Sequence, residues 1–222
     1  AGINVTASHN PAEYNGYKVY WEDGAQITPP HDVNITDAVL AITDYADAKT
    51  MDKDEAVKAG LYVQIGKDVD DKYIAALKKQ VKHQDAIDAV QKDIKIVYTP
   101  LHGTGNIPVR RVLKELGFEN VYVVKEQELP DGDFPTVSYP NPEAAEAFEL
   151  GLKLAKEVDA DLVLATDPDA DRLGVRVKDR EGIYHTLTGN MSGCLLADYT
   201  SSKIKEKQGL PKDGALIKTI VT

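Results

Sequence analysis

Residues 162–172 read LVLATDPDADR, and this stretch decides the fold. An apolar run typical of a buried strand ends in three alternating aspartates, Asp167, Asp169 and Asp171, and Arg172 follows them. In an extended or gently turning segment, residues i, i+2 and i+4 project to one side, so the three carboxylates should converge. Converging negative charges repel one another unless a cation lies between them, and hard oxygen ligands suit Mg²⁺. The position just after a buried strand is also where open α/β sheets bind ligands.

Other interpretations of the aspartate motif stay open from these residues alone. Aspartate-rich turns after strands also occur as solvated loops without a metal. A calcium-binding EF-hand loop is excluded, because its sixth and twelfth positions need glycine and glutamate, and here they hold Arg172 and Lys178. A haloacid-dehalogenase phosphatase also carries an aspartate pair after an apolar strand and uses the first aspartate, here Asp167, as its nucleophile.

The sequence around this stretch alternates between strand and helix patterns. Strands are expected at 94–98, 121–124, 162–166, 173–177 and 183–187, and helices at 106–116, 142–158 and 191–205. Strand–helix–strand units of this kind indicate parallel strands with right-handed crossovers. We therefore predict an α/β fold: a three-layer α/β/α domain with a mixed, largely parallel sheet, flanked by partial domains of the same type.

The flanking regions carry weaker patterns. We expect strands at 2–7, 17–21 and 215–221 and helices at 31–48 and 69–81. A charged linker is expected at 49–70, with a possible strand at 61–65, and a polar stretch at 79–92. Both ends of the chain read as strands already under way, so we expect a fragment of a longer protein. The predicted boundaries are 1–60 for the end of one domain, 61–187 for a complete domain and 188–222 for the start of a third.

The composition excludes several classes of function. The formal net charge is −10, which argues against a surface for nucleic acid or anionic membranes. No apolar run approaches the roughly 18 residues of a membrane span, and no signal peptide opens the chain. Cys194 is the single cysteine, so an intramolecular disulfide is excluded, and we expect a cytoplasmic protein.

A second cluster of reactive residues lies near the N-terminus. Ser8 stands between a strand pattern and a turn rich in small residues, where backbone N–H groups can hold an anion. His9, Asn10 and Lys18 add further hydrogen-bond donors within ten residues. A nucleophilic serine normally needs a base, yet the G-x-S-x-G pattern is absent, so a purely structural turn stays an alternative.

Taken together, the two motifs resemble the α-D-phosphohexomutase family of phosphoglucomutases and phosphomannomutases. The resemblance is carried by TASHNP at 6–11, by NG-x-K at 15–18 and by D-x-D-x-D-R at 167–172, in the family's order. TPLHGTG at 99–105 resembles the loop that opens the family's second domain, and TGN at 188–190 resembles the passage into its third. On this resemblance the chain is a central fragment of such an enzyme.

The resemblance implies a role for each matched residue. Ser8 would carry the phosphoryl group, and Asp167, Asp169 and Asp171 would bind Mg²⁺, with an oxygen of phosphorylated Ser8 as a further ligand. The remaining implied roles are phosphate binding by Arg172 and Asn10, acid/base catalysis by Lys18, and a proton or hydrogen-bond partner in His9.

The implied reaction interconverts the 1-phosphate and 6-phosphate of a hexose, or the corresponding phosphates of a pentose, through phosphoserine and a bisphosphorylated intermediate. The loops that set sugar specificity and clamp the second phosphate are not found in the chain, so we expect domains III and IV of the parent to supply them and the fragment to be inactive alone. Two alternatives remain open: a haloacid-dehalogenase-like phosphatase using Asp167, and a non-catalytic fragment that binds a metal or a partner chain.

Overall fold

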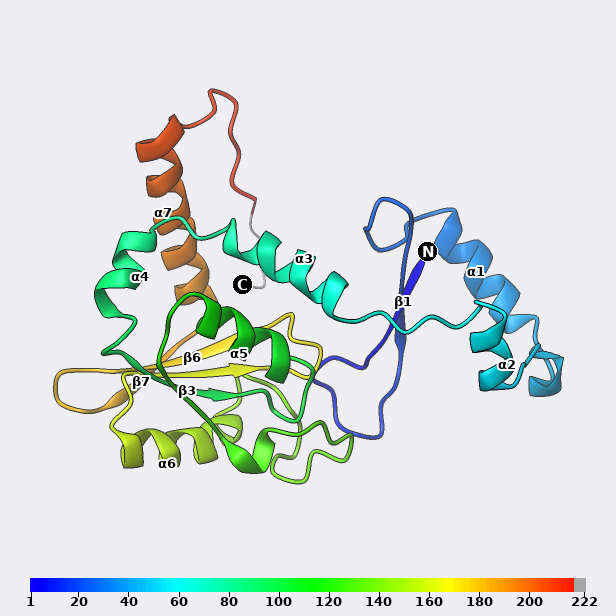
Figure 1. The fold of residues 1–222 in the computed structure, drawn as a ribbon, viewed down its shortest axis with the longest axis horizontal. Coiled ribbons are helices and arrows are strands. Elements are labelled where there is room, and N and C mark those ends of the chain that lie inside the picture. The colour runs from blue at the N-terminus through cyan, green and yellow to red at the C-terminus, as the bar shows by residue number, and fades with distance from the viewer. Residues whose placement is uncertain (218–222) are drawn as a thin grey trace. The chain divides into compact units, whose positions relative to one another are not determined.

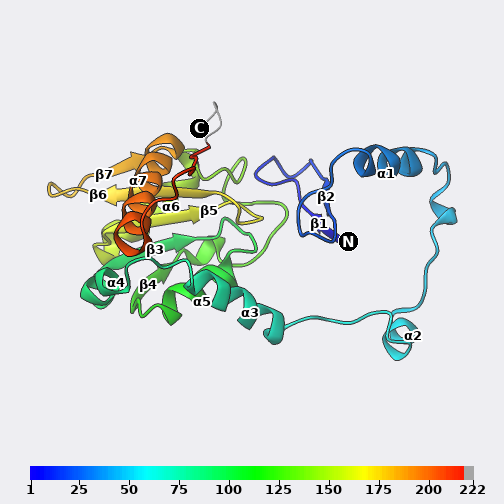
Figure 2. The ribbon, with the colours of Figure 1, turned by 90° about the horizontal axis from the view of Figure 1, so that it is seen from above.

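A computed structural model describes residues 1–217 and divides the chain into two compact units. The first unit contains residues 1–6 and 15–71, and the second contains residues 7–14 together with the chain from Lys72 onward. The loop that carries Ser8 therefore belongs to the second unit. Figures 1 and 2 show the elements of both units, which we describe separately.

The first unit is a two-stranded antiparallel sheet followed by short helices. Its elements are β1 (Gly2–Val5), β2 (Tyr17–Tyr20), α1 (His31–Leu40), a 3₁₀ turn (Tyr45–Asp47) and α2 (Lys53–Lys58), and α3 (Lys67–Lys78) crosses into the second unit. The helix expected at 31–48 ends early, because the Asp44 side chain accepts a hydrogen bond from the Ala46 N–H at 2.8 Å and starts the 3₁₀ turn instead. The strand considered at 61–65 does not form, and α2 occupies part of the expected linker.

The second unit is built on a five-stranded sheet in the order β4-β3-β5-β6-β7. Its strands are β3 (Lys95–Thr99), β4 (Asn120–Val123), β5 (Leu162–Thr166), β6 (Leu173–Lys178) and β7 (Tyr184–Leu187). β3 pairs in parallel with β4 and β5, whereas β6 pairs antiparallel with β5 and β7. The sheet is therefore mixed, as predicted, and it changes from parallel to antiparallel at the aspartate motif.

Helices cover both faces of this sheet. The helices are α4 (Gln84–Val90), α5 (Asn106–Glu115), α6 (Glu149–Val158) and α7 (Gly189–Gln208), with 3₁₀ turns at Lys125–Gln127 and Glu146–Phe148. Figure 1 shows α6 below the sheet and α5 and α7 on the opposite face. The predicted three-layer α/β/α architecture is confirmed.

Two of these helices differ from the sequence-based expectation. The helix expected from Pro142 begins only at Glu149, because the Asn141 side chain accepts from the Glu143 N–H at 2.9 Å and holds residues 141–144 in a turn. α4 forms within the polar stretch at 79–92, for which no helix was predicted. At the C-terminal end, residues 215–217 are not a strand, and residues 218–222 lie outside the described part of the chain.

The core lies between the sheet and α6. It is formed by the buried side chains of Val97, Leu101, Val124, Val137, Ala147, Phe148, Ala155, Ala160, Val163 and Ala165. Gly151 allows α6 to approach closely, since a Cβ there would lie 3.0 Å from a methyl group of Val163. This packing fixes the end of β5, from which the aspartate motif extends. Among the described residues, none of the helices combines the length and apolar character required to cross a membrane.

Candidate metal and phosphate site

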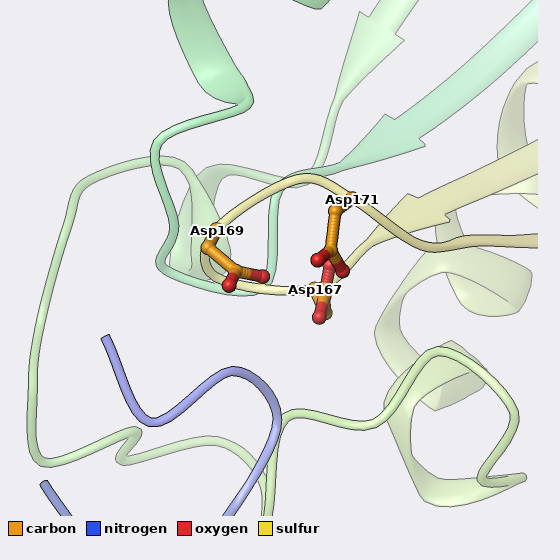
Figure 3. Close-up of side chains that lie close together, drawn as sticks. All are labelled: Asp167, Asp169 and Asp171. Carbon is orange, nitrogen blue, oxygen red and sulfur yellow. The ribbon is translucent and has the colours of Figure 1, made fainter. Parts of the chain in front are cut away.

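The three aspartates converge on one point in the turn between β5 and β6. Carboxylate oxygens of Asp167, Asp169 and Asp171 all lie within 4.8 Å of one another, and Figure 3 shows the side chains directed toward a common space. A tight turn produces this convergence: the Ala170 N–H donates to the Asp167 carbonyl at 2.9 Å, and Ala170 has a left-handed φ of 59°. The sequence-based expectation of converging carboxylates is confirmed, and a turn achieves it in place of extended alternation.

Asp167 is the innermost member of this group and is completely buried. One carboxylate oxygen accepts the backbone N–H of Arg172 at 3.1 Å, and the other accepts the Ser8 hydroxyl at 3.1 Å. Burial, and after it the negative charge of Asp169, together raise the pKa of Asp167 to about 6. A bound cation would reverse both effects, so the arrangement could hold a metal ion.

Ser8 reaches this group from a turn far away in the sequence. Its backbone has a left-handed φ of 57°, and the Asn10 N–H closes the turn by donating to the Ala7 carbonyl at 3.2 Å. The Ser8 hydroxyl lies 3.1 Å from Asp167 Oδ2 and 3.2 Å from His9 Nδ1. The structure thus brings the two sequence motifs together within one unit, with the hydroxyl beside the innermost carboxylate.

Two side chains with nitrogen donors, Arg172 and His9, accompany the carboxylates. Arg172 Nε lies 4.0 Å from Asp167 Oδ2 and 3.9 Å from Asp171 Oδ1, and about half of its side chain is exposed. Burial lowers the pKa of His9, the nearby Arg172 lowers it further, and the aspartates oppose this effect. His9 therefore favours the neutral imidazole, a form that can accept a proton.

The other two residues named from the sequence lie differently. Asn10 is an exposed residue of the Ser8 turn. Lys18 lies on β2 of the first unit, in register with Asn4, and is not one of the residues of the second unit that form the aspartate site.

A neighbouring loop supports the aspartate turn, and sequence reasoning did not assign it this role. The Thr104 N–H and hydroxyl both donate to the Pro168 carbonyl, at 2.8 and 2.9 Å. Gly103 lies so close that an added Cβ would be 2.4 Å from Pro168 Cα. The glycine-containing sequence TPLHGTG at 99–105 marked this segment as a loop. Its contact with Pro168, 64 residues after Thr104, is not evident from the sequence.

His102, in the same loop, has a structural role. Its side chain is buried, with Nδ1 3.3 Å from the Leu129 carbonyl and Nε2 2.9 Å from the Thr136 hydroxyl. These contacts hold the loop against the segment that follows β4.

Comparison with known proteins agrees with this geometry. Residues 71–182 match the family model described as phosphoglucomutase/phosphomannomutase, alpha/beta/alpha domain II, and residues 1–46 match the model for domain I. The chain belongs to the phosphoglucomutase/phosphomannomutase family. We therefore interpret the Ser8–aspartate site by comparison with the mutases of this family.

Individual members of the family are similar over nearly the whole chain. A probable phosphomannomutase of Haemophilus influenzae is 40% identical over 94% of this chain and 41% of its own length. A phosphoglucomutase of Staphylococcus epidermidis is 39% identical over 95% of this chain and 37% of its own. The crystal structure of a phosphoglucomutase/phosphomannomutase family protein from Burkholderia thailandensis superposes with a TM-score of 0.64 at 26% identity, covering 90% of this chain and 38% of that one. The chain thus spans about two fifths of the length of these relatives.

Proposed function

We propose that this chain forms the phosphoserine and metal-binding part of a phosphoglucomutase-type enzyme, which interconverts sugar 1-phosphate and sugar 6-phosphate through a bisphosphorylated intermediate. The observation that carries the proposal is the 3.1 Å separation of the Ser8 hydroxyl from Asp167 Oδ2 inside the aspartate group. A phosphoryl group on Ser8 would lie beside three carboxylates, and such a site needs a cation to be stable. Family membership supports the same assignment.

Each residue then has a distinct task. Asp167, Asp169 and Asp171 would hold Mg²⁺, a hard cation that prefers carboxylate and phosphate oxygens, together with an oxygen of phosphorylated Ser8. The metal, when bound, would neutralise the phosphate charge and polarise the phosphoryl group. Arg172 would contact the same phosphate, and Asn10 would donate a hydrogen bond to it.

The transfer step conserves the phosphoryl group. A sugar hydroxyl oxygen attacks the phosphorus of phosphorylated Ser8, the bond from phosphorus to the serine oxygen breaks, and the hydroxyl proton passes to a base. Lys18 is our candidate for this acid/base role, and His9, with its lowered pKa, is a proton or hydrogen-bond partner. In the return step Ser8 accepts the other phosphate of the bisphosphate, which releases the isomerised product.

The proposal also covers the sugar substrate and the cellular compartment of the enzyme. We favour glucose phosphate over mannose or pentose phosphate as the substrate, and a cytoplasmic parent. We also propose that the 222-residue chain alone lacks mutase activity, because sugar positioning and exclusion of water would come from domains III and IV of the parent.

The phosphatase alternative fits the geometry less well. A nucleophilic carboxylate must be able to reach a phosphorus atom, whereas Asp167 is completely buried and both of its oxygens already accept hydrogen bonds. That alternative also gives Ser8 no role, although Ser8 is one of the donors.

Phosphate mapping tests the proposal directly. The chain is incubated for a long period with excess ³²P-labelled glucose 1,6-bisphosphate and Mg²⁺, so that a single slow transfer to Ser8 is detected although repeated turnover needs domains III and IV. Labelled peptides are identified by mass spectrometry. We expect label on Ser8, none in Ser8→Ala, and unchanged labelling in Ser201→Ala, which removes an exposed hydroxyl on α7. Label on Asp167 that hydroxylamine releases would establish the phosphatase chemistry instead.

A magnesium titration tests the metal ligands separately. By calorimetry we expect Asp169→Ala to weaken Mg²⁺ binding at least tenfold, and Asp198→Ala, on α7 away from the aspartate turn, to leave it unchanged. Equal affinity in wild type and Asp169→Ala would contradict the assignment. Turnover of glucose 1-phosphate by the purified chain would contradict the proposed need for domains III and IV.

A further inference from the structure

A chain of side-chain hydrogen bonds connects the loop that supports the aspartate turn to the segment after β4, within the second unit. We call it the polar relay, and it consists of Thr99, Gln127, Thr136 and His102. Thr99 and Gln127 are almost completely buried, and His102 is only 5% exposed. Buried polar groups cost free energy unless they are hydrogen-bonded, and a fully satisfied buried network is rigid. The partner of each donor and acceptor therefore matters here.

The first part of the polar relay has a defined direction. Thr99 Oγ1 accepts the Leu101 N–H at 3.1 Å, so its own proton donates to Gln127 Oε1 at 2.7 Å. At the other end of the same amide, Gln127 Nε2 donates to Thr136 Oγ1 at 3.0 Å. The Thr136 hydroxyl thus receives one hydrogen bond and keeps its proton to donate onward. Gln127 joins the two hydroxyls and uses both ends of its amide.

His102 ends the polar relay and is held by its side chain and its backbone. Its Nδ1 lies 3.3 Å from the Leu129 carbonyl, which can only accept, so Nδ1 carries the proton. Nε2 then accepts the Thr136 hydroxyl at 2.9 Å. The His102 N–H donates to the Gln127 carbonyl at 3.0 Å, and the His102 carbonyl accepts the Asp131 N–H at 3.2 Å. The loop is therefore fastened to the segment after β4 at this one residue.

The loop held in this way has an unfavourable backbone conformation. Leu101 and His102 have successive left-handed φ values of 47° and 61°, although neither is glycine. Residues with a Cβ persist in this conformation only where the surrounding contacts impose it, and such residues are frequent at functional sites. The polar relay supplies the contacts. The next two residues, Gly103 and Thr104, are those that contact Pro168 of the aspartate turn.

We propose that Gln127 and Thr136 are positioning residues, which fix the geometry of the aspartate turn through His102 and its loop. Neither is a metal ligand in this proposal. A change in the segment after β4 should therefore reach the aspartates through hydrogen bonds. The metal that the turn would bind rests on the proposed function, whereas the ordering of the turn by the polar relay does not.

Amide hydrogen exchange of the 222-residue chain in EDTA, followed by NMR, tests this coupling without a metal. The reporters are the Thr104 N–H, which donates to the Pro168 carbonyl, and the Ala170 N–H, which donates to the Asp167 carbonyl. Thr136→Val removes the hydroxyl and keeps the branched shape, whereas Thr136→Ser keeps the hydroxyl. We expect both reporters to exchange roughly fivefold faster or more in Thr136→Val, and at nearly the wild-type rate in Thr136→Ser.

Magnesium affinity, measured by calorimetry, is the second readout. Gln127→Met keeps the length of the side chain and removes both polar ends. Gln127→Met and Thr136→Val should weaken Mg²⁺ binding by roughly three- to tenfold, less than the loss of a group that contacts a metal ligand directly. Leu154→Ala is the control, because Leu154 packs against the core from α6 and takes no part in the polar relay. It should lower stability without changing Mg²⁺ affinity or the two reporters.

Two outcomes would overturn the proposal. One is wild-type exchange of both reporters together with wild-type Mg²⁺ affinity in Thr136→Val. The other is that Leu154→Ala, at an equal loss of stability, accelerates the reporters as much as Thr136→Val does, because the effect would then come from loss of packing alone. The pair Thr136→Val and Thr136→Ser decides the question even if Gln127→Met does not fold.

The outcome is separable from that of the proposed function. Faster reporter exchange in Thr136→Val, with no label on Ser8 in the wild-type chain, would overturn the mutase mechanism and support the polar relay. Normal labelling of Ser8, with unchanged reporters and Mg²⁺ affinity in Thr136→Val, would overturn the polar relay alone.

Discussion

The two units of the chain use similar sequence patterns and reach different degrees of burial. In the first unit, apolar side chains of the strands and of α1 are exposed to solvent, with Ile3 70%, Val5 71% and Leu40 75% exposed, and none of the residues 1–6 and 15–71 is buried. In the second unit, Val97, Val163 and other core residues are fully enclosed. In the first unit, side chains of the two-stranded sheet and of α1 border an open hollow, whereas the five-stranded sheet has helices on both faces. Periodicity therefore predicts which residues could be buried, and the layer packed against them decides whether they are.

The largest expected effect of a substitution is in the core of the second unit. Phe148→Ala should lower the free energy of unfolding by about 3–5 kcal/mol, because it leaves a cavity among fully buried side chains and removes the ring under Arg176. Urea denaturation followed by circular dichroism measures this change. A loss below about 1 kcal/mol would break the comparison, since the second unit would then be as loosely packed as the first.

The buried charge of the second unit gives the next largest effect. The pKa of Asp167 is raised from 3.8 to about 6, so folding favours its protonated form. Without metal, the stability of wild type relative to Asp167→Asn should fall as pH rises from about 4 to 6, and Asp167→Asn should be more stable above pH 6 by at most about 3 kcal/mol. Below about pH 4 the difference should vanish.

Urea titrations of both proteins in EDTA at several pH values measure this difference. Mg²⁺ should reduce it, because the cation stabilises the ionised carboxylate. A constant difference across pH 4–7 would show that Asp167 titrates normally.

The loop that supports the aspartate turn should be sensitive to a single methyl group. Gly103→Ala would place a Cβ 2.4 Å from Pro168 Cα, so one backbone must move, at a cost of about 1–3 kcal/mol in stability and with weaker Mg²⁺ binding. Gly132→Ala is the matched control, because nothing lies within 4 Å of its added Cβ. Unfolding and magnesium titrations of the two variants should differ clearly. Normal Mg²⁺ affinity in Gly103→Ala would show that this loop does not position the aspartates.

The smallest effect is expected in the first unit. Leu40→Ala removes a side chain that is 75% exposed, so the stability of the chain should change by less than about 0.5 kcal/mol. The same urea experiment applies. A loss similar to that of Phe148→Ala would mean that Leu40 is enclosed in solution, and the contrast between the units would not hold.

The fold could be predicted where the hydrophobic pattern was strong. The strands of the second unit and α5 follow apolar runs, and their positions agree with the structure within one or two residues. The errors fall where a side chain competes with the backbone, at Asp44 and Asn141, where each side chain accepts a backbone N–H and holds a turn. The expected strand at 61–65 failed for another reason, since a strand needs a partner that sequence does not reveal.

The candidate site could be predicted as a set of residues but not as an arrangement. Asp167, Asp169 and Asp171 are recognisable from their spacing, although the left-handed turn at Ala170 that unites them is not. The approach of Ser8 to Asp167 joins positions 159 residues apart, and only the resemblance indicated it.

The antiparallel pairing of β5 with β6 has a consequence for how the aspartate turn could hold an ion. The pair Thr166–Leu173 closes the turn at its base, so its backbone is ordered when the sheet forms and not when the ion arrives. In the language of coordination chemistry, the turn resembles a macrocycle more than an open-chain chelator. We therefore expect an inserted residue anywhere in 167–172 to weaken metal binding more than an exchange of the residues between the aspartates.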